Sequence, residues 1–315
     1  MADPSLLIAP GSEHCFVDAL SPFALYFGNG IGIRWYGLAY LLGLAWGFWM
    51  AWRWSGAGRS PLSRPQIQDF VLAAGLGMLI CGRLGFCLFY AWPDVVDNPI
   101  GRMGLYDRTY GDYLPTGAVP RPDHEVVRRF EFPFILQVWN GGMASHGGLA
   151  GLVIGSWWYA RRQRMQLPVL LDMVSATAPM GVACGRIANF INGELWGRPS
   201  DAPWAVIFPH APTVGGFHVG RHPSQLYAAF LEGFIILAIV LPLHARHRRP
   251  GLTTGVVFCL YAIGRFVGEH FREPDIGQPG SPGHAAILGF MSKGQALTIP
   301  VFVVGLVILI WALRR

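Results

Sequence analysis

A polar cluster stands at the end of a long apolar run in this sequence. Residues 185–197 read GRIANFINGELWG and follow the run LPVLLDMVSATAPMGVAC. Within nine residues, Arg186, Asn189, Asn192 and Glu194 supply a guanidinium group, two amides and a carboxylate. A guanidinium group binds carboxylate or phosphate bidentately, so the cluster could hold an anion. Such a role would be strengthened by further cationic groups in neighbouring segments.

Three other apolar segments contain a cationic or titratable residue, namely Arg83, His146 and Arg265. An ionisable side chain inside a membrane costs ~2.5–3.5 kcal/mol on insertion scales and is a functional candidate for that reason. Taken alone, an arginine near a helix end usually reaches toward the headgroups, and a lone histidine is more often a buried hydrogen-bonding residue. Glycine or serine neighbours surround Arg83 and His146, and small residues allow helices to approach closely.

The composition indicates an integral membrane protein. Of the 315 residues, 52% are hydrophobic and only 13% are charged, with a mean hydropathy of +0.38, whereas soluble domains carry about 25% charged residues. A bilayer-spanning helix needs about 20 apolar residues. We therefore predict an all-α polytopic membrane protein, a single catalytic domain over residues 1–315, with seven transmembrane helices at 34–53, 69–91, 141–160, 167–191, 224–243, 252–271 and 295–313.

The arginines between these segments predict the orientation. The loops after the first, third and fifth segments and the tail after the seventh contain eleven arginines and no acidic residue. Short cytoplasmic loops carry such an excess of basic residues. The N-terminus is therefore expected outside and the C-terminus in the cytoplasm. The net charge of +6 reflects this topology, so we expect no nucleic-acid partner.

This orientation predicts a shared depth for the four intramembrane groups. At 1.5 Å per helical residue, Arg83, His146, Arg186 and Arg265 fall ~8–12 Å below the outer surface. The abundant anion at that depth is a phospholipid headgroup. We therefore predict a phosphate-binding site that faces the outer leaflet, with a histidine beside it. Neighbouring polar residues complete the predicted site: Tyr36, Asn189, Glu194, His222, Gln225, Tyr261, Glu269 and Arg272.

Two external loops are long enough to form structure of their own. Loop 92–140 is polar and rich in proline and glycine, without a helical period, and we expect it to lie on the membrane surface. Loop 192–223 contains Trp196, Trp204 and Phe208, which predict a small folded cap. The five cysteines form no CxxC motif and fit apolar packing. No metal-ligand spacing is visible, so no metal or other cofactor is expected.

The segment 185–197 resembles the signature of the bacterial prolipoprotein diacylglyceryl transferase family. Its fixed positions are filled by Gly185, Arg186, Asn189, Phe190, Asn192, Glu194 and Gly197. Five further motifs follow the family's order: RWYGLAY at 34–40, GRLGFCLFY at 82–90, GGMASHGGLAG at 141–151, RHPSQLY at 221–227 and YAIGRFVGEHFREPD at 261–275. The resemblance covers nearly all of the chain from residue 30. Loop 92–140 departs from it, because it is longer than the family usually has.

The resemblance implies a multi-pass enzyme of the bacterial inner membrane whose active site faces the outer leaflet and periplasm. Such an enzyme moves the diacylglyceryl group of phosphatidylglycerol to the lipobox cysteine of a prolipoprotein signal peptide, and releases glycerol-1-phosphate. It implies that Arg186 and Arg265 are essential. The family's other important positions match His146, Tyr261, Tyr36, Asn189, Glu194 and Gly197. Loop 192–223 would be its periplasmic head, and loop 92–140 would belong to its arm region.

The predicted mechanism divides the residues by role. His146 is the candidate base for the cysteine thiol, although arginines alone could lower the thiol pKa sufficiently. Arg186 and Arg265 would bind the phosphate, and Arg83 and His222 would contribute to the same site. Asn189 and Tyr261 would orient oxygens of the headgroup. Glu194 would orient an arginine. Two other classes of protein remain possible from the sequence: a transporter or flippase, and a non-catalytic lipid-binding scaffold. A transporter would need a charged path to the inner leaflet.

Overall fold

The computed structural model describes residues 7–28, 31–58, 60–97, 102–107, 112–113, 126–137, 144–247, 249–274, 287 and 290–315. The chain divides into two compact units. Unit 1 comprises Met1–Ile67 and Gln166–Arg315, and unit 2 comprises Gln68–Met165.

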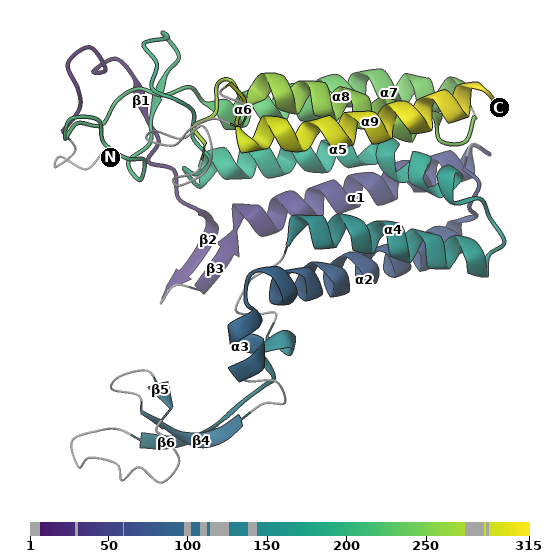
Figure 1. Cartoon of the computed structure of the whole chain (residues 1–315), viewed down its shortest axis with the longest axis horizontal. Helices are drawn as coiled ribbons and strands as arrows, with labels where there is room; N and C mark the ends of the chain where they lie inside the picture. The colour runs from purple at the N-terminus through teal and green to yellow at the C-terminus, as the bar shows by residue number, and fades with distance from the viewer. Residues whose placement is uncertain are drawn as a thin grey trace. The chain divides into compact units, whose positions relative to one another are not determined.

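Unit 1 is a helical bundle with a cap at one end (Figure 1). Its helices are α1 (Trp35–Gly56), α5 (Leu167–Ile191), α6 (Ser224–Ala228), α7 (Ile235–Arg246), α8 (Leu252–Gly268) and α9 (Lys293–Leu313), and a π-helical turn, η3 (Ala229–Phe234), joins α6 to α7. Helix α8 packs along α9, and α5 contacts α1, η3, α7 and α8. Small residues allow the closest approach: a Cβ atom on Gly43 of α1 would lie 2.7 Å from Gly181 Cα of α5.

The cap of unit 1 is formed by two segments far apart in the sequence. Strand β1 (Phe16–Val17) pairs in parallel with β7 (Val206–Ile207), and β2 (Phe23–Gly28) forms an antiparallel hairpin with β3 (Ile31–Arg34). A small core of Val206, Phe208 and Ala211 packs against Phe190 and Trp196. Residues 192–223 thus fold as a cap that the N-terminal segment completes. The pairing with the N-terminal segment was not among the predictions from sequence.

Unit 2 combines two helices with a small sheet. It contains most of α2 (Arg64–Phe89), then α3 (Trp92–Asp97), β4 (Arg102–Asp107), β5 (Asp112–Tyr113), β6 (Val126–Glu131), the 3-10 turn η1 (Phe134–Leu136) and α4 (Ser145–Arg162). The strands form an antiparallel sheet in the order β5-β4-β6. Helices α2 and α4 touch through glycines, since a Cβ atom on Gly77 would lie 2.3 Å from the Gly151 carbonyl oxygen. The mostly helical structure is consistent with the all-α prediction, to which this loop and the cap add short strands that were not predicted.

The predicted helices are present at all seven positions. In the described part of the chain, four are long and apolar enough to cross a membrane, namely Arg64–Phe89, Leu167–Ile191, Ser224–Arg246 and Lys293–Leu313, and Leu252–Gly268 is a shorter apolar helix. The mainly helical, membrane-type fold is thus confirmed. That all seven helices cross a membrane, and in which direction, remains a prediction.

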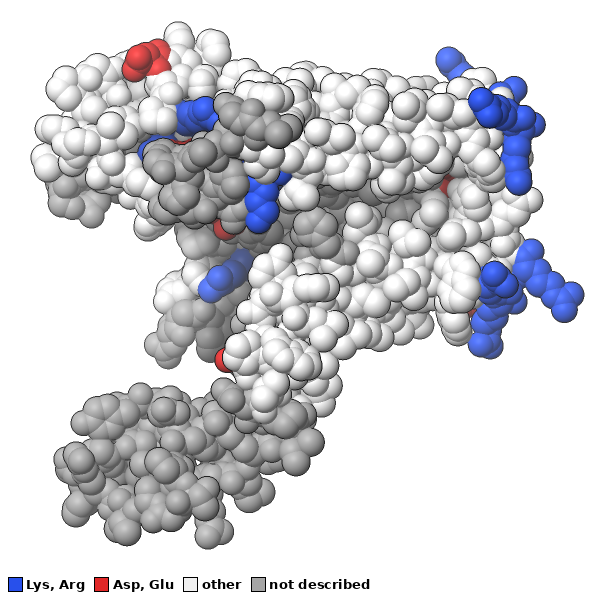
Figure 2. All heavy atoms as spheres, viewed as in Figure 1, with Lys and Arg blue, Asp and Glu red and all other residues white. Residues whose placement is uncertain are grey.

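Basic side chains gather at one end of each helical unit (Figure 2). The last turns of α1 and α7 contain Arg53 and Arg246, and the last turn of α4 contains Arg161 and Arg162. Several stack on tryptophans of the same helices; Arg161, for example, lies 5.4 Å from the ring centre of Trp157. Such arginine–aromatic pairs are favoured at the boundary between apolar and aqueous surroundings.

Candidate active site

A small pocket lies in unit 1 where α5, α6 and α8 approach the cap. Its lining residues are Arg186, Leu195, Ser224, Gln225, Ala228, Arg265, Gly268 and Arg272. Three of the eight are arginines from two distant parts of the sequence. The structure thus brings together Arg186 and Arg265, the two residues on which the phosphate-site prediction depends most. Arg272 joins them one turn beyond the end of α8.

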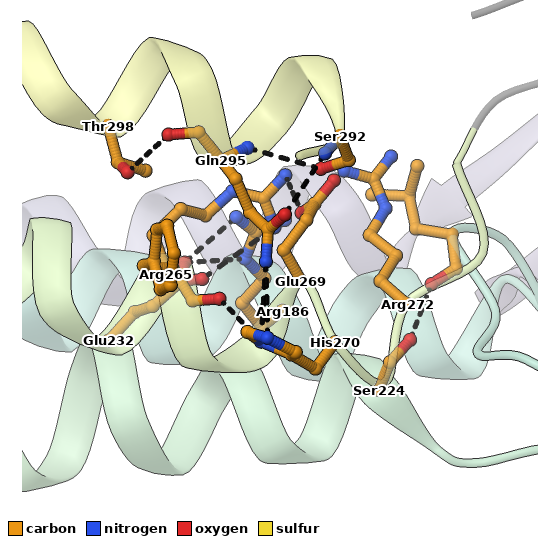
Figure 3. Close-up of polar contacts among 12 residues, drawn as sticks. Arg186, Ser224, Glu232, Arg265, Glu269, His270, Arg272, Ser292, Gln295 and Thr298 are labelled. Carbon is orange, nitrogen blue, oxygen red and sulfur yellow. Dashed lines mark hydrogen bonds and ion pairs between the residues drawn. The ribbon is translucent and has the colours of Figure 1, made fainter. Parts of the chain in front are cut away.

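A buried carboxylate lies behind two of these arginines (Figure 3). The Glu232 side chain has no exposed surface, and its Oε2 atom accepts hydrogen bonds from Arg186 Nη2 at 2.9 Å and Nε at 3.3 Å. Its Oε1 atom lies 3.8 Å from Arg265 Nη1. Glu232 belongs to the π-helical turn η3, and such turns occur frequently at functional sites. One carboxylate therefore orients both guanidinium groups.

Sequence reasoning did not select Glu232. The residue stands in the run LYAAFLEGFIILAIV, and the average over that run is strongly apolar. Its signal was nevertheless present, because a single carboxylate inside a membrane-length apolar helix is itself a functional candidate. Glu194, which was expected to orient an arginine, has other partners in the structure, and that role belongs to Glu232.

Arg265 has a second carboxylate partner one helical turn further along α8. Its Nη2 atom lies 2.7 Å from Glu269 Oε2, an i,i+4 pair in which both side chains are largely buried. Glu269 in turn packs against the first turn of α9, where a Cβ atom on Gly294 would lie 2.2 Å from Glu269 Oε1. The N-terminus of a helix favours a negative charge. Glu269 is thus held between an arginine and a helix N-terminus.

The first turn of α9 is itself firmly built. Ser292 caps the helix by accepting a hydrogen bond from Gln295 N, and the Gln295 side chain returns a bond to Ser292 N at 3.0 Å. This reciprocal arrangement is a capping box. The Gln295 amide nitrogen also lies 3.3 Å from His270 Nδ1, next to Glu269 in the sequence. These contacts connect the end of α8 to the start of α9.

The charges around the pocket favour an anionic ligand. Three guanidinium groups line it, while Glu232 and Glu269 supply two carboxylates. Charged hydrogen bonds are strong where water is scarce, and the Arg186 and Arg265 side chains are only 20% and 14% exposed. The guanidinium groups that line the pocket therefore favour an anionic ligand over a cationic one.

Three residues of the predicted site form a polar wall beside Arg186. The Asn189 amide donates to the Tyr36 hydroxyl and, over 3.2 Å, to Glu194 Oε1. The Asn192 amide lies 3.3 Å from the same oxygen. The following turn has left-handed backbone at Gly193 (φ 63°) and Leu195 (φ 57°). Tyr36 of α1 is thereby connected to the signature on α5.

Tyr261 approaches the site from α8. Its side chain interacts electrostatically with Arg186 and Arg265. The spacing of four residues predicts that Tyr261, Arg265 and Glu269 share one face of the helix. The contacts of all three with the arginine cluster agree with that prediction. A hydroxyl group is therefore available beside the guanidinium of Arg186.

The cap is attached to the pocket through short polar contacts. Gly197 N donates to the His222 carbonyl at 3.0 Å, and a Cβ atom on Gly197 would lie 2.3 Å from that oxygen. Glycine is therefore required at this position for steric reasons. The Gln225 amide donates to the Glu194 carbonyl at 2.6 Å, and Ser224 Oγ donates to the Leu195 carbonyl at 2.9 Å. These bonds hold the start of α6 against the signature turn.

His222 lies in an aromatic setting near the pocket but does not line it. Its Nδ1 atom is 3.2 Å from the Tyr227 hydroxyl, and its ring meets Phe271 edge-on at 5.3 Å. Burial lowers the pKa of His222. The adjacent Arg221 is fully buried and bonds to the carbonyls of Gly197 and Pro212 and to the Glu273 carboxylate. Sequence reasoning did not single out Arg221, whose contacts hold the cap together.

Two predicted site residues belong to unit 2. Arg83 is buried and donates to the carbonyls of Phe134 at 2.5 Å and Ile135 at 3.1 Å, with its guanidinium 5.0 Å from the Phe134 ring centre. His146 is the second residue of α4, and its side chain is outside the described part of the structure. Their participation in the phosphate site remains a prediction. Among the described residues, no group of three or more His, Cys, Asp or Glu residues could hold a metal ion.

The apolar helices and the arginine-lined pocket define a membrane-type helical protein with a cationic pocket. A family model described as prolipoprotein diacylglyceryl transferase matches residues 22–106 and 127–311. The chain belongs to this family, which confirms the resemblance found in the sequence. The unmatched residues between the two ranges lie in loop 92–140, where the sequence was expected to depart from the family.

Curated relatives agree over nearly the whole chain. The chain is 38% identical to the phosphatidylglycerol–prolipoprotein diacylglyceryl transferase of Bradyrhizobium diazoefficiens over 94% of this chain and 93% of the relative. It is 37% identical to the enzyme of the same name from Photobacterium profundum over 94% of both chains. For the equally named protein of Methylococcus capsulatus the identity is 36%, over 94% of this chain and 97% of the relative.

Proposed function

We propose that this protein transfers the diacylglyceryl group of phosphatidylglycerol to the lipobox cysteine of a prolipoprotein, the first step of bacterial lipoprotein maturation. Membership of the family makes it a transferase, and the names of its relatives specify the two substrates. The structural observation that carries the proposal is the pocket in which Arg186, Arg265 and Arg272 converge over the buried Glu232.

The reaction increases negative charge at the phosphate. The cysteine sulfur forms a bond to the terminal carbon of the diacylglyceryl group, and the bond from that carbon to the phosphate oxygen breaks. The thiol proton is released, and the phosphodiester, with one negative charge, becomes glycerol-1-phosphate with up to two. Groups already oriented toward the developing charge stabilise the transition state most. Arg186 and Arg265 are held in this way by Glu232 and Glu269.

The remaining residues of the pocket support this step. The Tyr261 hydroxyl, next to Arg186, would hydrogen bond a headgroup oxygen. Asn189, fixed by Tyr36 and Glu194, would limit where the headgroup can lie. His146 is the proposed base for the thiol, because the ordinary pKa of imidazole lies near neutrality. Alternatively, the arginines alone lower the thiol pKa enough, and His146 is then dispensable. No metal or other cofactor takes part in this scheme.

We further propose that all seven helices cross the bacterial inner membrane, with the N-terminus and cap in the periplasm and the C-terminus in the cytoplasm. The basic last turns of α1, α4 and α7 support cytoplasmic ends for these helices. Within unit 1, the pocket lies near the C-terminus of α5 and the N-terminus of α6, away from the basic end of α7. Phosphatidylglycerol would then enter sideways from the outer leaflet. Residues 192–223 would serve as the periplasmic head, and 92–140 as the arm.

Purified protein in detergent with phosphatidylglycerol and a lipobox peptide tests the proposal. We expect a thioether-linked diacylglyceryl peptide and one equivalent of glycerol-1-phosphate, measured by mass spectrometry. Arg265→Ala and Arg186→Ala should each lower the rate at least a hundredfold, as loss of one donor to a developing oxyanion does. Lipid binding without product would instead indicate a scaffold. Movement of lipid between leaflets of a vesicle without thioether formation would indicate a flippase.

The role of His146 needs a separate measurement. A His146→Gln variant should lose activity most strongly near neutral pH and recover part of it as rising pH ionises the thiol without help. A near-normal rate across the pH range would show that His146 is not the base. That result would not affect the proposed binding of phosphate by Arg186 and Arg265, the phosphate clamp, because both residues belong to unit 1.

A further inference from the structure

Arg198 is placed next to the pocket without lining it. It directly follows Gly197, the last fixed residue of the signature, and its backbone is bound on both sides: N donates to the Phe271 carbonyl at 2.9 Å, and O accepts from His222 N at 3.1 Å. Its Nε atom donates to the Arg272 carbonyl at 3.2 Å. Since the Arg272 side chain lines the pocket, Arg198 is fixed beside the pocket's outer arginine.

The Arg198 side chain is exposed. Among the described residues, it forms no ion pair in the structure. The acidic residue next to Arg272 in the sequence, Glu273, is committed to Arg221. By contrast, Arg186 and Arg265 are mostly buried and paired with Glu232. Positive charge therefore continues from the buried clamp through Arg272 to an exposed guanidinium at the rim.

We infer that Arg198 binds the phosphate monoester product at the rim of the pocket as the product leaves for water. This inference rests on the proposed function. The lipid substrate reaches the pocket with its acyl chains in the membrane, whereas glycerol-1-phosphate has none and must leave through water. It also carries more negative charge than the diester from which it came. A positive residue on the rim changes the rates and the salt dependence with which a soluble anion enters and leaves.

Product inhibition by added glycerol-1-phosphate isolates this role. In Arg198→Gln the inhibition constant should rise about fivefold at low ionic strength, and the difference from wild type should shrink in 0.5 M salt. Arg198→Lys should recover part of the affinity, because it keeps the charge but not the fork of donors. The matched control is Arg246→Gln, since Arg246 is exposed at the end of α7, ~33 Å along the helical segment from Ser224. It should leave the inhibition constant unchanged.

Two further measurements separate product from lipid. The single-turnover rate and the KM for phosphatidylglycerol in Arg198→Gln should both stay within about twofold of wild type. An unchanged inhibition constant would overturn the inference. So would a KM for phosphatidylglycerol that rises in parallel, because Arg198 would then contact the lipid headgroup instead. Failure of the proposed function would look different, since wild type itself would make no thioether.

Discussion

Glu232 Oε2 lies 2.9 Å from Arg186 Nη2, inside an apolar helical bundle where the carboxylate has no exposed surface. Its other oxygen lies 3.8 Å from Arg265 Nη1. Removing such a group from water costs several kcal/mol, which the attraction between the charges repays only when the geometry is good. A buried ion pair is therefore a weak explanation of stability. The position of Glu232 is better explained by the need to hold Arg186 and Arg265 in a fixed orientation before the anion binds.

Replacing Glu232 by alanine should destabilise the protein and impair the reaction. Loss of one partner of a buried ion pair costs about 3–5 kcal/mol, because the remaining charge is left uncompensated. We expect a lower thermal unfolding midpoint in detergent and a single-turnover rate reduced at least tenfold at temperatures where the variant remains folded. Glu13→Ala, at an exposed position, is the control. Activity and stability equal to wild type would show that Glu232 does not orient the arginines.

A methyl group on residue 294 should disturb the second carboxylate of the clamp. In Gly294→Ala the new Cβ atom would meet Glu269 Oε1 at 2.2 Å and Cδ at 2.5 Å. Because Glu269 is only 3% exposed, it can yield only by shifting its pair with Arg265. We expect kcat to fall at least fivefold with a smaller change in KM. Gly75→Ala, which places its methyl group in open space, should keep the wild-type kcat; equal kcat in both variants would contradict the prediction.

The sequence predicted the cationic half of the site better than its acidic half. Arg186 and Arg265 could be found because each interrupts an apolar segment, and the alternating arginine-rich loops put both at one depth. Glu269 followed from its spacing of four residues from Arg265. Glu232 was missed because the hydropathy of its segment hides a single carboxylate. The π-helical turn that presents it has no local sequence signal that we recognised.

The parts of the fold that depend on distant pairing were also missed. Seven helices could be predicted because each needs only a local run of apolar residues. The parallel pairing of β1 with β7 joins residues about 190 positions apart, and two-residue strands carry no periodicity. The sheet in loop 92–140 was missed for a similar reason, since proline and glycine there suggested irregular structure. Arg83 drew attention by its charge, whereas its contacts with the η1 carbonyls could not be read from sequence.

Asp172 should contribute to stability far from the pocket. Its carboxylate accepts hydrogen bonds from Gly251 N at 2.7 Å, Thr254 N at 2.8 Å and Thr254 Oγ1 at 2.7 Å, and so caps α8 from the neighbouring helix α5. Loss of a cap costs about 1–2 kcal/mol. Asp172→Ala should therefore lower the thermal unfolding midpoint, and Asp172→Asn should lower it less.

The rate of Asp172→Ala at low temperature should stay within about twofold of wild type. Thr254 lies eleven residues before Arg265 on α8, which corresponds to ~17 Å along the helix. The change should therefore not reach the clamp while the helix is intact. A large loss of activity in fully folded protein would show that Asp172 acts on the site through the helix.

His222 should make the stability of the protein depend on pH. Burial lowers the pKa of His222 below its ordinary value of 6.5, so the unfolded chain takes up a proton at a higher pH than the folded one does. Stability should be unaffected by this residue above pH 6.5, and should fall as the pH drops from 6.5 to the lowered pKa. The decrease then levels off, because both states are protonated at lower pH.

Thermal unfolding midpoints between pH 8 and pH 5, for wild type and His222→Gln, test this dependence. Unfolding is preferable to the reaction rate as a readout, because the proposed base His146 would also change the rate with pH. The glutamine can still contact the Tyr227 hydroxyl, 3.2 Å from His222 Nδ1, but it does not titrate. The decrease below pH 6.5 should therefore be smaller in His222→Gln than in wild type, and His247→Gln, at an exposed position, should follow wild type. Identical slopes in wild type and His222→Gln would mean that protonation of other groups accounts for the acid sensitivity.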